Sequence, residues 1–210
     1  MTEREVPLEP VRPGGLGALL ERRRSTRDFA PRPLSLALLS LVLRAAQGRT
    51  GDGRRTCPSA HALYPLAVTA VAGDVDGLPA GVYRYGAERD ALTLVSEGDH
   101  RRRVSDTTLA DRDWLPRAPV LLLISGDLEA AGRHFADQPP QGRRGERYVW
   151  LEAGHAGQNV YLQAAEAGLG AVLVAGFDDE RLLGLAPAVV PPGHHPLGLI
   201  GVGHPADRRE

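Results

Sequence analysis

A short, unbroken apolar run, VLLLIS at Val120–Ser125, constrains the fold of this chain more than any other feature. A strand that is apolar at every position has to be covered on both of its faces. The run is far too short to cross a membrane, so the cover has to come from the rest of the chain. The sequence therefore predicts a buried strand in a sheet that has helices packed against it.

The remaining segments alternate irregularly between strand and helix patterns. Further strands are predicted at 66–72, 81–85, 91–95, 171–175 and 197–202, with 81–95 forming a hairpin. Helices are predicted at 16–24, 36–47 with Ser35 as N-cap, 99–110, 146–167 and 178–185. Because helices and strands do not follow a strict βαβ order, the pattern predicts an α+β fold with helices flanking a central sheet.

The length of 210 residues suits one domain. Residues 1–14 are charged and rich in proline, so we expect an N-terminal arm and no signal peptide, followed by a single domain at 15–210. The one cysteine, Cys57, allows no internal disulfide and suggests a reducing compartment. Together these features predict a cytoplasmic location.

The chain has no lysine, so all 25 residues counted as lysine or arginine are arginine. This absence excludes mechanisms that use a lysine, such as Schiff-base chemistry and the phosphate-binding Walker A loop. Arginine is the only strong fixed cation left for an anionic ligand. The net charge of −1 gives no reason to expect a nucleic acid or a membrane as a partner.

Three segments carry candidate chemistry. The first, RRRSTRDF at Arg22–Phe29, combines arginine forks with two hydroxyls that can bind a phosphate, although a solvated helix end has the same pattern. The second, PSAHALYP at Pro58–Pro65, precedes a predicted strand. The third, GLGAVLVAGFDDE at Gly168–Glu180, runs from a buried strand into a helix, and its Gly176 allows a close approach of the backbone to a flat ligand. Taken singly, the second and third segments also fit ordinary loop chemistry.

One face of the predicted long helix carries only small or β-branched apolar residues. They are Val149, Ala153, Ala156, Val160, Ala164 and Ala167. This stripe of small residues can pack against a sheet of the same chain or against a second copy of the helix. Glu152 and His155 share a helix face, but the second such motif that a two-metal site needs is missing, so no metal site is predicted.

Together, and in this order, these segments resemble the nitroreductase-like FMN-dependent oxidoreductases. RRSTRDF from Arg23 resembles the family's RRSxRxF, and PSAHALYPLAV resembles the motif PSAGALYPLEV of its SagB-type dehydrogenase branch. ERYVWLEAGHAGQNVYLQAAEAGLGAV, GVYRY, GFDDERLLGL and LIGVGHP resemble further family segments, so the resemblance covers about residues 16–205. It implies a nitroreductase-like fold with a mixed, mainly antiparallel sheet, and a homodimer with its flavins at the subunit interface.

The resemblance also implies positions around the FMN. Arg23 and Ser25, with Arg24 beside them, match residues that hold its phosphate and ribityl chain, and Arg27 matches a basic residue at the pyrimidine edge of the flavin. The turn of Pro58, Ser59 and Ala60 matches one that reaches the flavin ring from the partner subunit. The backbone of Ala175 and Gly176 matches the segment facing flavin N5, and Arg208 or Arg209 is the candidate for completing the phosphate site.

Two departures from the family pattern bear on the chemistry. His61 stands where the branch motif has glycine, and its imidazole either donates a proton near neutral pH or only fills space. Azoline-oxidising SagB-type enzymes use a Lys-Tyr pair as base, and here the nearest analogue is Arg147-Tyr148, in which arginine is a poor base. His61 and Tyr148 are therefore the candidate catalytic residues.

The activity that the resemblance implies is hydride transfer at flavin N5. One interpretation is a SagB-type dehydrogenase that acts on a peptide or a small-molecule natural product. An alternative is an NAD(P)H-dependent reductase of nitro compounds or quinones. A third interpretation, from another class, is a non-catalytic partner subunit of a modification complex that keeps the flavin fold.

Overall fold

Six strands form one sheet in the order β5-β4-β2-β6-β8-β7, and every pairing within it is antiparallel. They are β2 (Leu66–Ala72), β4 (Gly81–Gly86), β5 (Ala91–Glu97), β6 (Val120–Gly126), β7 (Gly170–Val174) and β8 (His195–Gly203). All seven residues of β6 are buried, as its apolar run predicts. A separate parallel pair, β1 (Leu34–Ser35) with β3 (Val75–Asp76), makes the strand pairing mixed but mainly antiparallel, which confirms the predicted fold class.

This computed structural model describes all residues except 1–4, 6, 8, 10–13, 186–188 and 208–210. Most of the predicted arm at 1–14, and both Arg208 and Arg209, therefore lie outside the described residues. The helices are α1 (Gly15–Arg22), α2 (Leu36–Gln47), α3 (Arg101–Ser105), α4 (Leu128–His134), α5 (Arg144–Glu166) and α6 (Asp179–Leu183), with 3₁₀ turns at Ala60–Ala62 (η1) and Leu115–Arg117 (η2). Within the described ranges, no helix is both long enough and apolar enough to cross a membrane.

The N-cap predicted for α2 is confirmed, because the Ser35 hydroxyl accepts a hydrogen bond from the Leu38 N–H at 3.3 Å. The helix predicted at 99–110 is wrong in length. It ends at Ser105, and the hydroxyls of Thr107 and Thr108 donate back to the carbonyls of Val104 and Ser105 at 2.7 Å each. Such local bonds compete with continued helix, and the chain turns instead to pair with the segment after β7.

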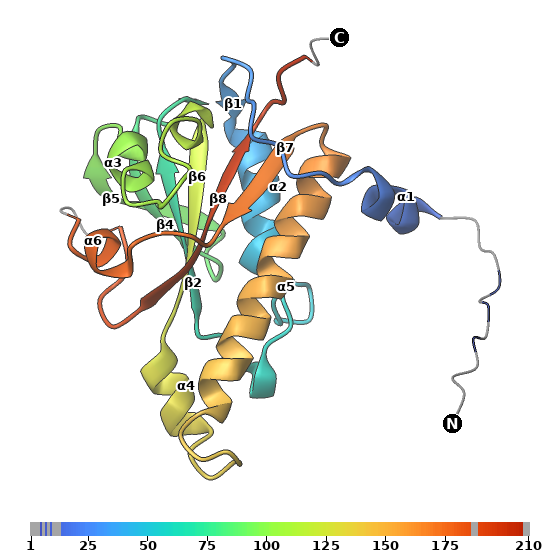
Figure 1. Cartoon of the computed structure of the whole chain (residues 1–210), viewed down its shortest axis with the longest axis vertical. Coiled ribbons are helices and arrows are strands. Elements are labelled where there is room, and N and C mark those ends of the chain that lie inside the picture. Colours follow the sequence, from blue (N-terminus) through green and yellow to red (C-terminus); the bar gives the residue numbers. More distant parts are fainter. Residues whose placement is uncertain (1–4, 6, 8, 10–13, 186–188, 208–210) are drawn as a thin grey trace.

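Helix α4 was not predicted from the sequence. It has only seven residues, too few for a clear apolar period. Its local signal is Asp127, whose side chain accepts a hydrogen bond from the Ala130 N–H at 2.8 Å as the N-cap. Together α4 and α5 form a helical hairpin that projects below the sheet (Figure 1).

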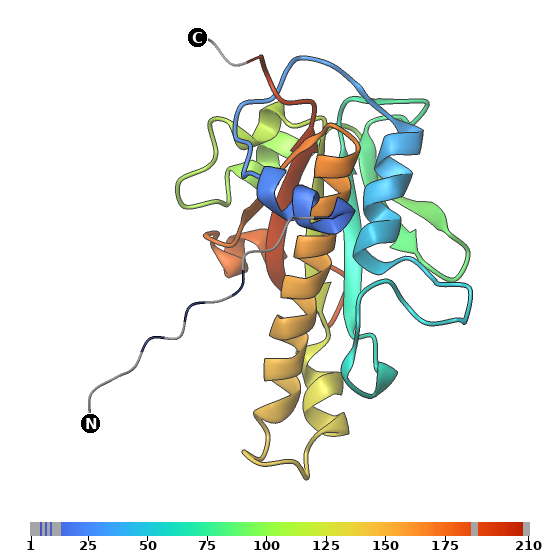
Figure 2. The ribbon, with the colours of Figure 1, turned by 90° about the vertical axis from the view of Figure 1, so that its right-hand side faces the viewer.

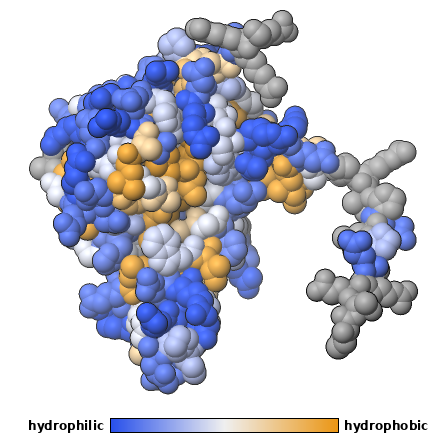
Figure 3. Space-filling model, viewed as in Figure 1, coloured by the Kyte–Doolittle hydropathy of each residue, from blue (hydrophilic) through white to orange (hydrophobic). Residues whose placement is uncertain are grey.

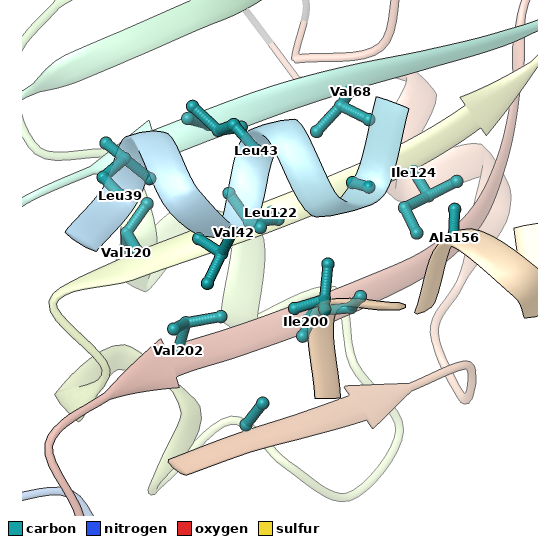
Figure 4. Packing of buried hydrophobic residues seen from close by; sticks show 14 of the residues in the cluster. Leu39, Val42, Leu43, Val68, Val120, Leu122, Ile124, Ala156, Ile200 and Val202 are labelled. Carbon is teal, nitrogen blue, oxygen red and sulfur yellow. The ribbon is translucent and has the colours of Figure 1, made fainter. Parts of the chain in front are cut away.

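The sheet is covered on both faces by helices. Helices α2 and α5 run side by side across one face (Figures 1 and 2), and α3, η2 and α6 cover the other. Alternate side chains of β6 enter the two resulting cores, with Leu122 on the α2–α5 side and Leu121 on the other. Figure 4 shows the first core, where α2 side chains lie over those of β6 and β8.

The stripe of small residues on α5 packs inside the chain. Five of its six members, from Val149 to Ala164, are buried against the sheet, and Ala167 packs at the border of the same core. The alternative in which this stripe contacts a second copy of the helix is therefore wrong. The outward side of α5 carries Trp150 and Leu151 instead, and both are about half exposed.

Candidate functional site

The arginine-rich segment Arg22–Phe29 leaves α1 and is fixed between β7 and the end of β8. Its anchor is Phe29, which is buried in the second core. The Thr26 N–H donates to the Ala171 carbonyl at 3.0 Å, and the Ala30 N–H donates to the His204 carbonyl at 2.9 Å. Because two backbone hydrogen bonds and Phe29 hold this segment in place, its side chains have a defined orientation.

A cavity of about 710 Å³ lies beside this segment. That volume falls within the roughly 300–1,000 Å³ range of small-molecule pockets. Its lining residues are Arg22, Arg24, Ser25, Thr26, Arg27, Asp28, Tyr161, Ala165, Gly168, Leu169, Ala171, Pro205, Ala206 and Asp207. Three guanidinium groups and three hydroxyls outweigh two carboxylates there, so the donor set suits an anion such as a phosphate.

Tyr161, which sequence reasoning missed, connects three parts of this site. Its hydroxyl oxygen accepts a hydrogen bond from the Leu173 N–H of β7 at 2.8 Å and lies 3.1 Å from Ser25 Oγ. The Arg23 guanidinium stacks over its ring, 5.3 Å from the centroid. The sequence marks Tyr161 only by its position directly after the stripe residue Val160, at the border of the buried face of α5. The structure shows that its hydroxyl reaches the edge strand β7.

The predicted arginines take different positions in the structure. Arg24 lines the cavity and donates to the carbonyls of Glu21 and Arg23. Arg27 lines it too, with its guanidinium 5.9 Å from the centre of the Trp114 ring. Arg23 instead lies over the Tyr161 ring. Arg22 lines the cavity, although it is not one of the predicted ligands.

The turn Pro58–Ser59–Ala60 lies against the N-terminal half of α5, and its backbone is strained. Three residues that follow it have positive φ, namely His61 at 53°, Ala62 at 54° and Tyr64 at 51°. Non-glycine residues seldom adopt this region. The Ser59 hydroxyl stabilises the turn by accepting a hydrogen bond from the Tyr64 N–H at 2.8 Å.

The two candidate catalytic residues both contact Phe135. The His61 ring centroid is 4.9 Å from that of Phe135, and the Tyr148 centroid is 4.8 Å from it. His61 Nδ1 also lies 3.1 Å from Nε2 of His134, and Tyr148 donates to the Gln138 side chain at 3.2 Å. The structure thus brings His61 and Tyr148 to one aromatic cluster and adds His134 to it.

A buried carboxyl, Glu152, lies beneath the turn. It is 3% exposed, and burial raises its pKa, with hydrogen bonds from Ser59 and Gln47 partly offsetting that rise. Cys57 is fully buried beside it and donates to the Glu152 carbonyl at 3.3 Å. Burial, with the Glu152 charge as a second cause, raises the pKa of the Cys57 thiol to about 12, so this thiol is not a nucleophile near neutral pH.

Ala175 and Gly176 follow the end of β7 and are both exposed. The Gly176 carbonyl accepts a hydrogen bond from the Leu109 N–H at 2.9 Å, and a Cβ built on Gly176 would meet nothing nearer than Leu109 at 3.8 Å. The backbone here is therefore open to a flat ligand. Among the described residues, no group of three or more histidine, cysteine or carboxylate side chains is arranged to hold a metal ion.

A family model described as the nitroreductase family matches residues 20–204. The chain belongs to the nitroreductase family. It is 35% identical over 200 residues to the nitroreductase-family protein MJ1384 of Methanocaldococcus jannaschii, covering 95% of this chain and 96% of that one. Among solved structures, a nitroreductase-family protein of Ralstonia eutropha JMP134 is 30% identical with a TM-score of 0.75, covering 96% of this chain and 89% of that one.

A second solved structure, from Desulfovibrio desulfuricans, was determined in complex with FMN. It has a TM-score of 0.63 at 20% identity and covers 95% of this chain and 94% of that one, which shows a shared fold.

Two segments of this nitroreductase-family chain lie at different points along α5: the arginine-rich segment and the turn Pro58–Ser59–Ala60, called the PSA turn below. The first contacts Tyr161 and the second adjoins Glu152, nine residues earlier, which is about 14 Å along the helix axis. The cavity beside Arg22–Phe29 has no lining residue from the turn, and the small cavity lined by Ser59 and Ala60 has none from Arg22–Phe29. One chain therefore presents two separate halves of the predicted site.

Proposed function

We propose that this protein is an FMN-dependent oxidoreductase. The observation that carries the proposal is the cavity of about 710 Å³ beside Arg22–Phe29. Its arginines and hydroxyls fit a phosphate monoester, and no lysine is needed for that role. The family membership and the FMN complex of the D. desulfuricans relative support the same cofactor.

Five of the predicted ligands have a role within one chain in this proposal. Arg24 and Ser25 bind the phosphate from the cavity wall, and Arg23 approaches from its place over Tyr161. Arg27 supplies positive charge at the pyrimidine edge, and the open backbone at Gly176 accommodates the flavin ring. When bound, the flavin supplies hydride transfer at N5, while the protein supplies binding, orientation and charge.

The second half of the site comes from another copy of the chain in this proposal. The face around β7 and β8 carries a hydrophobic area bordered by hydrophilic residues (Figure 3). A cavity of about 220 Å³ lies at that face between α5 and β7–β8, lined by residues that include Trp150, Leu173 and Ala175. A homodimer that covers this face would bring the PSA turn of one copy toward the flavin of the other. Sedimentation should then give about 45 kDa, twice the 22.5 kDa of one chain, and a species of single-chain mass would refute the dimer.

Two reactions compete within this proposal. The PSAHALYPLAV segment favours a SagB-type dehydrogenase with a peptide or small-molecule natural product as substrate. The chain offers no lysine as base, however. The Tyr148 hydroxyl donates to Gln138, and the Arg144 guanidinium lies over the Tyr148 ring, 5.9 Å from its centre. This favours the alternative, a reductase that takes hydride from NADH or NADPH and passes it to a nitro compound or a quinone.

Stopped-flow absorbance of the FMN-loaded protein separates these reactions. Rapid bleaching of the flavin band by NADH or NADPH supports the reductase. Bleaching by an azoline-containing peptide, without a nicotinamide, supports the dehydrogenase. Bound FMN that neither donor reduces would favour the non-catalytic partner subunit, and the SagB-type interpretation and the cytoplasmic location both stay predictions until tested.

A further inference from the structure

The Tyr161 side chain joins the arginine-rich segment, helix α5 and the edge strand β7. Its hydroxyl has one proton and two lone pairs. The Leu173 N–H occupies one lone pair at 2.8 Å, which leaves the proton and one lone pair of Tyr161 for its second neighbour, Ser25 Oγ, at 3.1 Å. The stacked Arg23 guanidinium adds positive charge on the ring face, which favours donation by the phenol.

The direction of the bond between Tyr161 and Ser25 decides what Ser25 can bind. If Tyr161 donates, the Ser25 proton is free to point into the cavity that both residues line. If Ser25 donates, its oxygen offers only lone pairs to the cavity and repels an anion. An anion in the cavity selects the first arrangement, and the chain of hydrogen bonds from Leu173 through Tyr161 to Ser25 strengthens each member.

We propose that Tyr161 is a positioning residue that makes Ser25 a hydrogen-bond donor and thereby selects ligands that carry a phosphate monoester. This inference rests on the proposed FMN site and adds a residue that determines its selectivity. It is carried by three contacts of one side chain and by the cavity that Tyr161 and Ser25 share.

The test compares FMN with riboflavin, which lacks the phosphate. Affinities are measured by quenching of flavin fluorescence for the wild type, Tyr161→Phe, Ser25→Ala and the double variant. Tyr161→Phe should weaken FMN binding about tenfold, the loss expected for one hydrogen bond that reaches a charged group, and riboflavin binding less than about twofold. The double variant should bind FMN like Ser25→Ala alone, because Tyr161 acts through Ser25.

Tyr85→Phe is the matched control, because it also removes a tyrosine hydroxyl that is hydrogen-bonded, to Asp90 at 2.8 Å in the β4–β5 hairpin at the opposite edge of the sheet. It should leave both flavin affinities unchanged. Equal losses of FMN and riboflavin affinity in Tyr161→Phe would overturn the inference, since a purely structural role predicts them. Full additivity with Ser25→Ala would overturn it too.

A second arm uses inorganic phosphate alone and separates this inference from the proposed function. Millimolar phosphate should raise the melting temperature of the wild type more than that of Tyr161→Phe, at constant ionic strength set with chloride. If the wild type binds no FMN but shows this difference, the proposed function fails and the role of Tyr161 stands. If neither FMN nor phosphate binds to the wild type, both fail.

Discussion

Gly170 of β7 lies directly against Thr26 of the arginine-rich segment, so a substitution there displaces the anion site without changing an arginine. A Cβ at Gly170 would stand 2.5 Å from Thr26 Cγ2, 2.6 Å from its Cβ and 2.8 Å from its Oγ1. Carbon atoms pack best at about 3.5–4.0 Å, so Gly170→Ala forces Thr26 outward by about 1 Å. That movement strains the 3.0 Å hydrogen bond between the Thr26 N–H and the Ala171 carbonyl.

The expected cost has two parts. Overpacking of this kind costs about 1–3 kcal/mol, and losing the hydrogen bond costs about 1 kcal/mol, partly offset by the lower chain entropy of alanine in the unfolded state. We expect a net loss of about 2 kcal/mol, which lowers the melting temperature by about 4–8 °C for a chain of this length. Because Ser25 moves with Thr26, FMN affinity should fall about tenfold or more.

The assay measures thermal unfolding and FMN affinity in parallel for Gly170→Ala. Gly132→Ala in α4 is the matched control, because a Cβ there meets nothing within 4 Å, and it should raise stability by about 0.5–1 kcal/mol. Adding Thr26→Gly to Gly170→Ala removes all three clashing atoms and should restore FMN binding in part. An unchanged FMN affinity in a destabilised Gly170→Ala protein would refute the link between this contact and the site.

Three further outcomes follow from the structure. Burial raises the pKa of Glu152 above its ordinary 4.5, so the folded state binds more protons at this carboxyl than the unfolded state does. The free energy of unfolding should therefore fall as the pH rises from that value toward neutral. Glu152→Gln should flatten this slope in a series of melting temperatures, and Glu180→Gln, at an exposed position, should not. Leu122→Ala in β6 should cost about 2–5 kcal/mol in urea unfolding, against less than about 1 kcal/mol for the partly exposed Leu41→Ala. His61→Gly should raise the melting temperature, since glycine adopts φ 53° without strain, while it lowers turnover if the imidazole donates a proton.

Local sequence signals predicted most of the fold. The apolar run at Val120–Ser125 located the central strand, Ser35 marked the start of α2, and the hairpin β4–β5 followed from its turn residues. These features depend on neighbours within a few positions of one another. The end of α3 and the existence of α4 depended on hydroxyl and carboxylate bonds that periodicity does not report.

Most of the candidate site depended on contacts between distant parts of the chain. Tyr161 meets Ser25 across 136 positions, and His134 meets His61 across 73. Neither pair leaves a pattern in one sequence, because each is created by the packing of α5 and α4 against the turns that follow other elements. Arg22–Phe29 was found from its clustered arginines and hydroxyls, and the flavin roles of this segment and of the PSA turn came from their resemblance to family motifs. Their separation along α5 became visible only in the structure.

The FMN site is tested most directly by the visible spectrum of the purified protein, mixed with FMN and then filtered to remove free flavin. We expect the protein to retain close to one FMN per chain, and to retain much less riboflavin under the same conditions. A colourless protein that retains neither flavin would show that the cavity beside Arg22–Phe29 is not an FMN site.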